Sequence, residues 1–139
     1  MQNVTKEKLN NLTYQIIGAA IEVHKHLGPG LLESIYHRCL KHELSIRNIS
    51  YSTELSIPIN YKGECLDANL RCDLLIENTI VLELKAVEVL VPIFETKLLS
   101  YMGLLQKPKG ILINFCCFNL VKEGQKTFVN EYFRDLPVE

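Results

Sequence analysis

Three charged side chains interrupt the apolar stretch between Cys72 and Lys85, and their types suit metal-assisted chemistry. Asp73 lies in a first apolar run, while Glu83 and Lys85 lie in a second. Because side chains alternate faces along a strand, Glu83 and Lys85 point the same way. The two carboxylates could bind Mg²⁺, and the Leu84 carbonyl could add a third oxygen. The lysine could then activate water or stabilise charge on a phosphate, which is the chemistry of phosphodiester hydrolysis.

The position of Asp73 relative to the other two residues depends on the turn between the predicted strands. A two-residue turn at 77–78 places Asp73 opposite Leu82. A three-residue turn at 77–79 places it opposite Glu83, on the same face, and such loops are common in hairpins. The proposed chemistry therefore depends on the register of this hairpin.

The same three residues also have a purely structural interpretation. Opposite charges facing each other on an exposed hairpin are common, and each such pair contributes roughly 0.2–1 kcal/mol. Spacing alone favours this interpretation. However, residues 80–84 are otherwise apolar, which predicts burial on both faces, and charges are uncommon there unless they are paired or bind something.

Apolar periodicity predicts the elements that position these residues. Spacings of three and four predict helices, and a period of two or a short apolar run predicts strands. The expected helices are 5–27, 31–47 and 94–105, and the expected strands are 51–61, 70–76, 80–84, 111–115 and 127–132. Pro58 makes the first strand an edge or a bulge. This order predicts an α/β (α+β) fold with a mixed sheet flanked by helices, in a single domain over residues 1–139.

Composition narrows the classes of protein. Apolar residues make up 47% of the 139 positions, charged residues 22%, and the net charge is −1. Global electrostatics therefore do not indicate nucleic-acid binding, and any phosphate contact must come from a local patch. With no signal-peptide core and no apolar run of membrane-spanning length, we expect a soluble cytoplasmic protein.

Other candidate ligands give weaker signals. No CxxC pair is present, so we expect the cysteines to be reduced core residues; they are Cys39, Cys65, Cys72, Cys116 and Cys117. The histidines show no metal-binding spacing, and we expect structural or surface roles for His24, His26, His37 and His42. A local basic rim could form from Lys25, Arg38, Lys41, Arg47, Lys97, Lys107 and Lys109. A solvated helix face explains the first four equally well.

The stretch from Gly30 to Tyr36, GLLESIY, matches the motif that names the GxxExxY proteins. Further stretches resemble that family in the same order, at 16–24, 73–76, 83–88, 98–101 and 112–115. The resemblance runs from about Leu12 to Phe118. The family is grouped with the PD-(D/E)XK nuclease-like superfamily, so the resemblance implies a restriction-endonuclease-like core, a mixed sheet with flanking helices.

The resemblance also implies roles for individual residues. It makes Asp73 and Glu83 the metal-binding acids and Lys85 the catalytic lysine. Glu33, which alone would be a carboxylate favoured by its helix dipole, becomes a fourth member that reaches the metal directly or through water. Tyr36 lies near the same helix face and would support the site or touch the substrate.

One departure from the family pattern concerns the third helix. Family members commonly carry His-Glu-Ala-Gln where this chain has residues 94–97, Phe-Glu-Thr-Lys. Lys97 thus replaces a glutamine that usually faces the active site. Its amine could contact a phosphate, or it could compete with metal for the two acids. Tyr101 shares a helix face with Lys97, and we expect both to bind substrate.

Three functions follow as hypotheses. The first is a Mg²⁺- or Mn²⁺-dependent nuclease that hydrolyses phosphodiester bonds in DNA or RNA. The second is a nucleic-acid-binding or protein-interaction module that keeps the nuclease-like fold without turnover, which the low net charge and Lys97 favour. The third is a small dimeric structural domain, in which divalent cations would not raise the melting temperature. A homodimer is compatible with all three.

Overall fold

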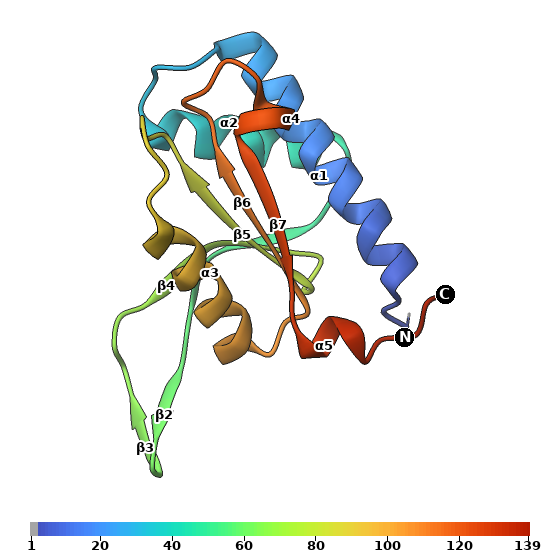
Figure 1. Cartoon of the computed structure of the whole chain (residues 1–139), viewed down its shortest axis with the longest axis vertical. Helices are drawn as coiled ribbons and strands as arrows, with labels where there is room; N and C mark the ends of the chain where they lie inside the picture. Colours follow the sequence, from blue (N-terminus) through green and yellow to red (C-terminus); the bar gives the residue numbers. More distant parts are fainter. Residues whose placement is uncertain (1–2) are drawn as a thin grey trace.

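The computed structural model describes residues 3–139. In chain order its elements are α1 (Lys6–Leu27), α2 (Glu33–Ile46), β1 (Tyr51–Ser56), β2 (Ile59–Tyr61), β3 (Glu64–Leu66), β4 (Arg71–Ile76), β5 (Ile80–Lys85), α3 (Pro92–Leu105), β6 (Lys109–Asn114), α4 (Leu120–Glu123), β7 (Gln125–Val129) and α5 (Glu131–Arg134). Figure 1 shows their arrangement.

A mixed sheet organises the described part of the chain. Its five strands lie in the order β1-β4-β5-β6-β7. Only the β5–β6 pair is parallel, and the neighbouring pairs are antiparallel. Parallel neighbours require a crossover connection, which α3 provides. The two strands that carry the candidate acids, β4 and β5, are therefore both interior strands.

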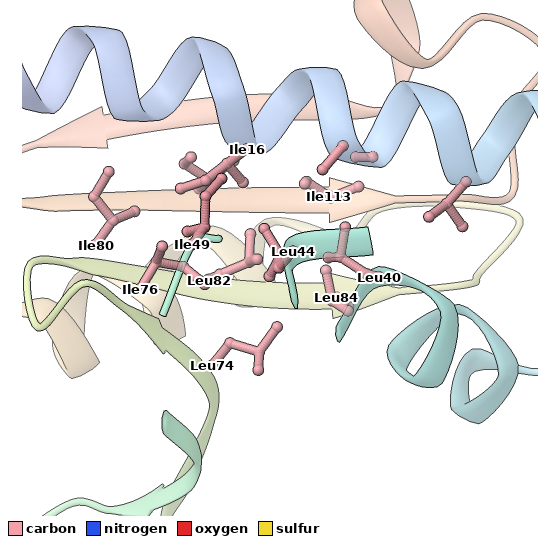
Figure 2. Close-up of a cluster of buried hydrophobic side chains, with 14 of the residues drawn as sticks. Ile16, Leu40, Leu44, Ile49, Leu74, Ile76, Ile80, Leu82, Leu84 and Ile113 are labelled. Atoms are coloured by element: carbon pink, nitrogen blue, oxygen red, sulfur yellow. The ribbon is translucent and has the colours of Figure 1, made fainter. Parts of the chain in front are cut away.

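Helices cover both faces of this sheet. Side chains from α1 and α2 pack with one face in a large apolar cluster, part of which Figure 2 labels, including Ile16, Leu40, Leu82 and Ile113. On the other face α3 packs in a second cluster, in which Leu98 and Met102 meet Leu75, Val81 and Leu112. Every residue of β6 is buried, as expected for a strand covered on both faces.

The N-terminal helix is anchored at its start. The side chain of Thr5 caps α1 by accepting a hydrogen bond from the Lys8 N–H at 3.1 Å. The Lys6 N–H donates to the Pro137 carbonyl at 2.9 Å, which ties the start of the helix to the end of the chain, as Figure 1 shows. No helix within residues 3–139 combines the length and apolar character needed to cross a bilayer.

A narrow hairpin made by β2 and β3 projects away from the sheet in Figure 1. It lies in the connection between β1 and β4, so the strand predicted over 51–61 is in fact two strands separated at Pro58. Residues 60–69 are exposed throughout. The β1 strand, which precedes this proline, is an edge strand, in agreement with the prediction.

The α/β (α+β) fold class predicted from the sequence is confirmed: a mixed sheet flanked by helices. The third helix begins at Pro92, two residues earlier than predicted, because proline is favoured in a first helical turn. The short helices α4 and α5 were not predicted, since four-residue segments carry no periodicity. All five cysteines are free, but the expectation that they are core residues is wrong for Cys65, which is exposed on β3.

Candidate active site

The hairpin between β4 and β5 has the three-residue turn. Ile76 pairs with Ile80, and the register continues to Leu74 opposite Leu82. Glu77 and Asn78 adopt left-handed φ values of 49° and 57°, which close the turn. The same register brings Asp73 level with Glu83, so the two-residue alternative, with Asp73 opposite Leu82, is wrong.

The paired residues of β4 and β5 end at Leu74 and Leu82, and beyond them the side chains of Asp73 and Glu83 accept backbone hydrogen bonds. The Asp73 N–H donates to Glu83 Oε1 at 3.1 Å, and the Leu84 N–H donates to Asp73 Oδ2 at 2.9 Å. Each carboxylate thus accepts a backbone hydrogen bond from the opposite strand. The Phe115 N–H bonds the Lys85 carbonyl on the β6 side, so strand alternation turns the peptide groups of Leu84 toward Asp73.

Strand β4 changes orientation at Asp73. Leu74 packs in the cluster with α1 and α2, whereas Cys72 packs in the cluster with α3, although residues two apart normally share a face. On the neighbouring strand, Glu54 has a left-handed φ of 48° at the same level. This local irregularity coincides with the end of the paired residues of β4 and β5, where the two carboxylates accept the backbone N–H groups.

The two carboxylates of Asp73 and Glu83 repel each other, and the nearby positive charge of Lys85 does not offset this repulsion. Glu83 is only 7% exposed. Burial, and next the charge of Asp73, raise the pKa of Glu83 from 4.5 to about 8. Burial, followed by the charge of Glu83, likewise raises the pKa of the Cys72 thiol to about 11. Cys72 is therefore a core thiol with no tendency to act as a nucleophile.

The interpretation of these residues as exposed ion pairs is contradicted. Within residues 3–139, no salt bridge joins Lys85 to Asp73 or Glu83. The Lys85 amine instead lies over the ring of Phe94, 4.5 Å from its centroid. A cation–π contact holds the amine beside the acids without pairing it to either.

The loop before α2 holds Glu33 at the edge of the site. Gly28 and Gly30 have φ values of 69° and 97°, which favour glycine, and they turn the chain out of α1. The Tyr36 hydroxyl donates to the Gly28 carbonyl and accepts from the Leu31 N–H. This clamp fixes the loop immediately before Glu33, the first residue of α2.

Tyr36 also connects α2 to the sheet. Its ring is fully buried and stacks on Phe115 with centroids 4.5 Å apart. The prediction that Tyr36 binds substrate is therefore wrong, because its ring is enclosed and its hydroxyl is used by the loop. The other role considered for it, support of the site, stays a prediction, and the hydroxyl contacts with the loop before Glu33 are compatible with it.

The polar cluster formed by Glu33, Asp73, Glu83 and Lys85 also includes His37, which the sequence interpretation missed. Its Nε2 lies 3.6 Å from Glu33 Oε2 and 3.7 Å from Asp73 Oδ2. It is the group that connects Glu33 on the helix with Asp73 on the strand. The available signal was its position four residues after Glu33, which places both on one helix face. The other histidines lie elsewhere: His24 bonds the Cys117 carbonyl, and His26 and His42 line a separate cleft of about 570 Å³ between α1 and α2.

A buried amide shapes the loop that leads from β5 to α3. The Asn114 side chain at the end of β6 accepts from the Val87 N–H at 3.0 Å and donates to the Val87 carbonyl at 2.9 Å. Fixing this loop fixes the start of α3 and with it Phe94. Sequence reasoning treated Asn114 only as part of a strand.

Of the predicted substrate-binding residues on α3, one is exposed and one is buried. Lys97 is exposed, and its amine lies 5.6 Å from the centroid of the Tyr101 ring. Tyr101 is 4% exposed and belongs to the core, so its prediction as a substrate contact is wrong. Within the described residues Lys97 forms no salt bridge with Asp73 or Glu83, so it does not occupy the place of a metal ion.

The predicted basic rim does not form as a unit. Lys109 is buried, where its amine bonds Asn10, and burial lowers the pKa of Lys109. Lys107 bonds Asn78 at the hairpin turn, at the end of the sheet away from Glu83. Arg47 pairs with Glu43, and Arg38 lines the cleft between α1 and α2.

A protein-family model matches most of the chain. The model of the PD-(D/E)XK nuclease superfamily matches residues 10–128, which include Glu33, His37, Asp73, Glu83 and Lys85. The chain belongs to this superfamily. Comparisons with curated proteins and with solved structures find no match. The superfamily implies a nuclease-type reaction, and its members generally use divalent metals such as Mg²⁺.

The donor set suits the divalent metal of a PD-(D/E)XK nuclease, but it is not a preassembled cage. Among residues 3–139, no three His, Cys, Asp or Glu side chains are already arranged to hold an ion. The fit comes from chemistry. Asp73 and Glu83 present hard oxygen ligands, and their mutual repulsion in a buried place is what a divalent cation relieves.

Proposed function

We propose that the protein is a divalent-metal-dependent nuclease of the GxxExxY type, hydrolysing phosphodiester bonds in DNA or RNA. It would act as a single domain over residues 1–139. The observation that carries this proposal is the pair of carboxylates of Asp73 and Glu83. Each accepts a backbone hydrogen bond from the opposite strand, Glu83 is buried, and within the described residues Lys85 forms no salt bridge with either. Superfamily membership supports the class of reaction.

Asp73 and Glu83 would hold Mg²⁺ or Mn²⁺, with the Leu84 carbonyl as a third oxygen. Glu33, which is exposed at the start of α2, would reach the ion directly or through water. When bound, the ion would supply positive charge that polarises the phosphate and lowers the pKa of water. The loop clamp by Tyr36 keeps Glu33 within reach.

Lys85 would act on the phosphate itself. Phe94 holds its amine beside Glu83 but unpaired, so the ammonium can donate a hydrogen bond to a phosphate oxygen on which charge builds, or orient the attacking water. Contacts of this type cost about 10²–10³ in rate when they are removed. Lys97, exposed on α3, would contact the nucleic-acid backbone.

The test is cleavage of labelled single- and double-stranded DNA and RNA with Mg²⁺ or Mn²⁺. We expect wild type to cleave at least one of these substrates. Lys85→Ala should lower the rate about 10²–10³-fold, with binding kept within about threefold, since one phosphate contact among several sets only part of the affinity. Lys122→Ala, an exposed lysine on α4, is the matched control and should cleave normally. If wild type cleaves none of the four, or Lys85→Ala cleaves as fast as wild type, the proposal is wrong.

A second candidate is a nucleic-acid-binding or protein-interaction module without turnover. Two observations favour it: the described residues contain no preassembled metal cage, and Lys97 replaces the usual glutamine. This candidate predicts binding without cleavage at any metal concentration. A binding assay run beside the cleavage assay separates the two.

A further inference from the structure

Three loops meet at the end of the sheet at which Lys85 lies, as Figure 1 shows. They are the α1–α2 loop at 28–32, the β5–α3 loop at 86–91 and the β6–α4 loop at 115–119. The Phe115 N–H donates to the Lys85 carbonyl, and the Asn114 side chain exchanges two hydrogen bonds with the Val87 backbone. The Tyr36 ring stacks on Phe115, while its hydroxyl bonds the first of these loops. These contacts tie the three loops together beside Lys85.

These loops, together with the start of α3, expose large apolar side chains. This group, called the apolar rim below, consists of Leu31, Leu32, Val89, Val91, Ile93 and Phe118. Phe118 is 91% exposed, more than any other large apolar residue within 3–139. Single apolar side chains are common on protein surfaces, but a group of them at one place marks a binding surface. Because the rim borders Lys85, a substrate bound at Lys85 would contact it.

The backbone on both sides of Phe118 is fixed. Before it, the Cys117 carbonyl accepts a hydrogen bond from His24 Nε2 at 2.8 Å. After it, the Asn119 side chain caps α4 by accepting from the Lys122 N–H at 3.1 Å. The ring itself is outside the core, so this arrangement presents a solvated aromatic face without stabilising the fold. A binding group that is already held in place loses less conformational entropy when its ligand arrives.

The charges near the rim are too few for a grip on a nucleic-acid duplex. Duplex binding depends on neutralising several phosphates. The chain has a net charge of −1, and the basic rim predicted from the sequence does not form. The proposed phosphate contacts are only Lys85 and Lys97. In a duplex the base faces are stacked on one another, whereas a single strand exposes them to aromatic side chains.

We propose that Phe118 and the apolar rim around it bind unpaired bases, so that the site takes single-stranded nucleic acid in preference to a duplex. This inference rests on the proposed function, which makes nucleic acid the substrate. It assigns the phosphates to Lys85 and Lys97 and the base faces to Phe118. Stacking needs a flat ring at position 118, whereas a protein docked on the rim needs only an apolar side chain of suitable size.

Fluorescence anisotropy with a chelator present measures binding of a labelled oligonucleotide as a single strand and as a duplex, without cleavage. We expect wild type to bind the single strand at least about tenfold more tightly, since base stacking is available only there. Phe118→Ala should weaken single-strand binding about 5–150-fold, because loss of a base–aromatic stack costs about 1–3 kcal/mol. Phe118→Trp should retain the affinity, and Phe118→Leu should lose it as the alanine variant does.

Tyr14→Ala is the matched control, since Tyr14 is an 82% exposed aromatic residue on α1. It precedes His24 by ten residues, about 15 Å along the helix, and its variant should bind as wild type does. Urea denaturation should give wild-type stability for the three Phe118 variants, because the ring is solvated in the folded protein. A loss of affinity then reports the missing ring and not a damaged fold.

Several results would overturn the inference. They are a duplex bound as tightly as the single strand, binding of neither form, and wild-type affinity in Phe118→Ala or Phe118→Leu. Sedimentation tests the protein alternative: self-association that Phe118→Ala abolishes, with oligonucleotide binding unchanged, would make the rim an interface between copies of the chain. If duplexes are cleaved in preference and Phe118→Ala cleaves normally, only this inference fails. If single strands bind through Phe118 but nothing is cleaved with Mg²⁺ or Mn²⁺, only the proposed function fails.

Discussion

Replacing Glu83 by glutamine should stabilise the metal-free protein at alkaline pH. Glu83 is buried beside Asp73, and its pKa is raised from 4.5 to about 8 in the folded protein. The folded state therefore binds more protons than the unfolded state between these values, so the free energy of unfolding falls as pH rises through them. Below pH 4.5 both states are protonated and Glu83 contributes no slope.

The size of the effect follows from the pKa change. One pKa unit corresponds to about 1.4 kcal/mol, so the loss between pH 4.5 and 8 is at most about 5 kcal/mol. This is a large fraction of the roughly 5–15 kcal/mol that stabilises a typical domain. Glutamine keeps an oxygen that can accept the Asp73 N–H but carries no charge, so the variant should lack most of this slope.

Urea denaturation at pH 5 and pH 8, with a chelator present, measures the change. Wild type should lose several kcal/mol between the two pH values, and Glu83→Gln should lose much less. Glu88→Gln, an exposed acid in the loop after β5, is the matched control and should follow wild type. Asp73 and Lys85 also face Glu83, but they are present in all three proteins. Equal slopes in wild type and Glu83→Gln would refute the reasoning.

Two further predictions concern the elements that support the site. Tyr36→Phe leaves the Leu31 N–H and the Gly28 carbonyl without their partner, and it should lower the free energy of unfolding by about 1–3 kcal/mol; urea denaturation measures this, and an unchanged stability would show that the clamp is not needed. Gly110→Ala places a methyl group 2.5 Å from the Met102 sulfur, where α3 crosses β6, and should cost about 1–3 kcal/mol by overpacking. The same substitution at Gly103, which faces open space, is its control, and equal effects at both positions would contradict the packing.

The fold was predictable because its strongest signals are local. Apolar periodicity located α1 and α2 to within about two residues, and the continuous apolar run at 80–84 indicated a strand covered on both faces. The register of the hairpin was not predictable. Both turn lengths keep an apolar pattern, and the left-handed conformation of Glu77 and Asn78 that decides between them is visible only in the structure.

The missing members of the site share a physical reason. His37, Phe94 and Asn114 each act through a partner on another element: Asp73 on β4, Lys85 on β5, and Val87 in the loop before α3. A single sequence contains no signal for such tertiary pairs. The acids and the lysine were found because a charge inside an apolar strand is conspicuous without knowledge of its partner.

In the stretch from Gly30 to Tyr36, two residues have structural roles and a third faces the polar cluster. Gly30 provides a backbone conformation, and Tyr36 clamps the loop and stacks on the sheet, while Glu33 alone faces the cluster. This division bears on Lys97. Its amine lies over Tyr101 and, within the described residues, pairs with neither Asp73 nor Glu83. Because the carboxylates and their supports do not involve position 97, the lysine there would leave the proposed metal ligands as they are and would alter only the surface proposed to meet the substrate.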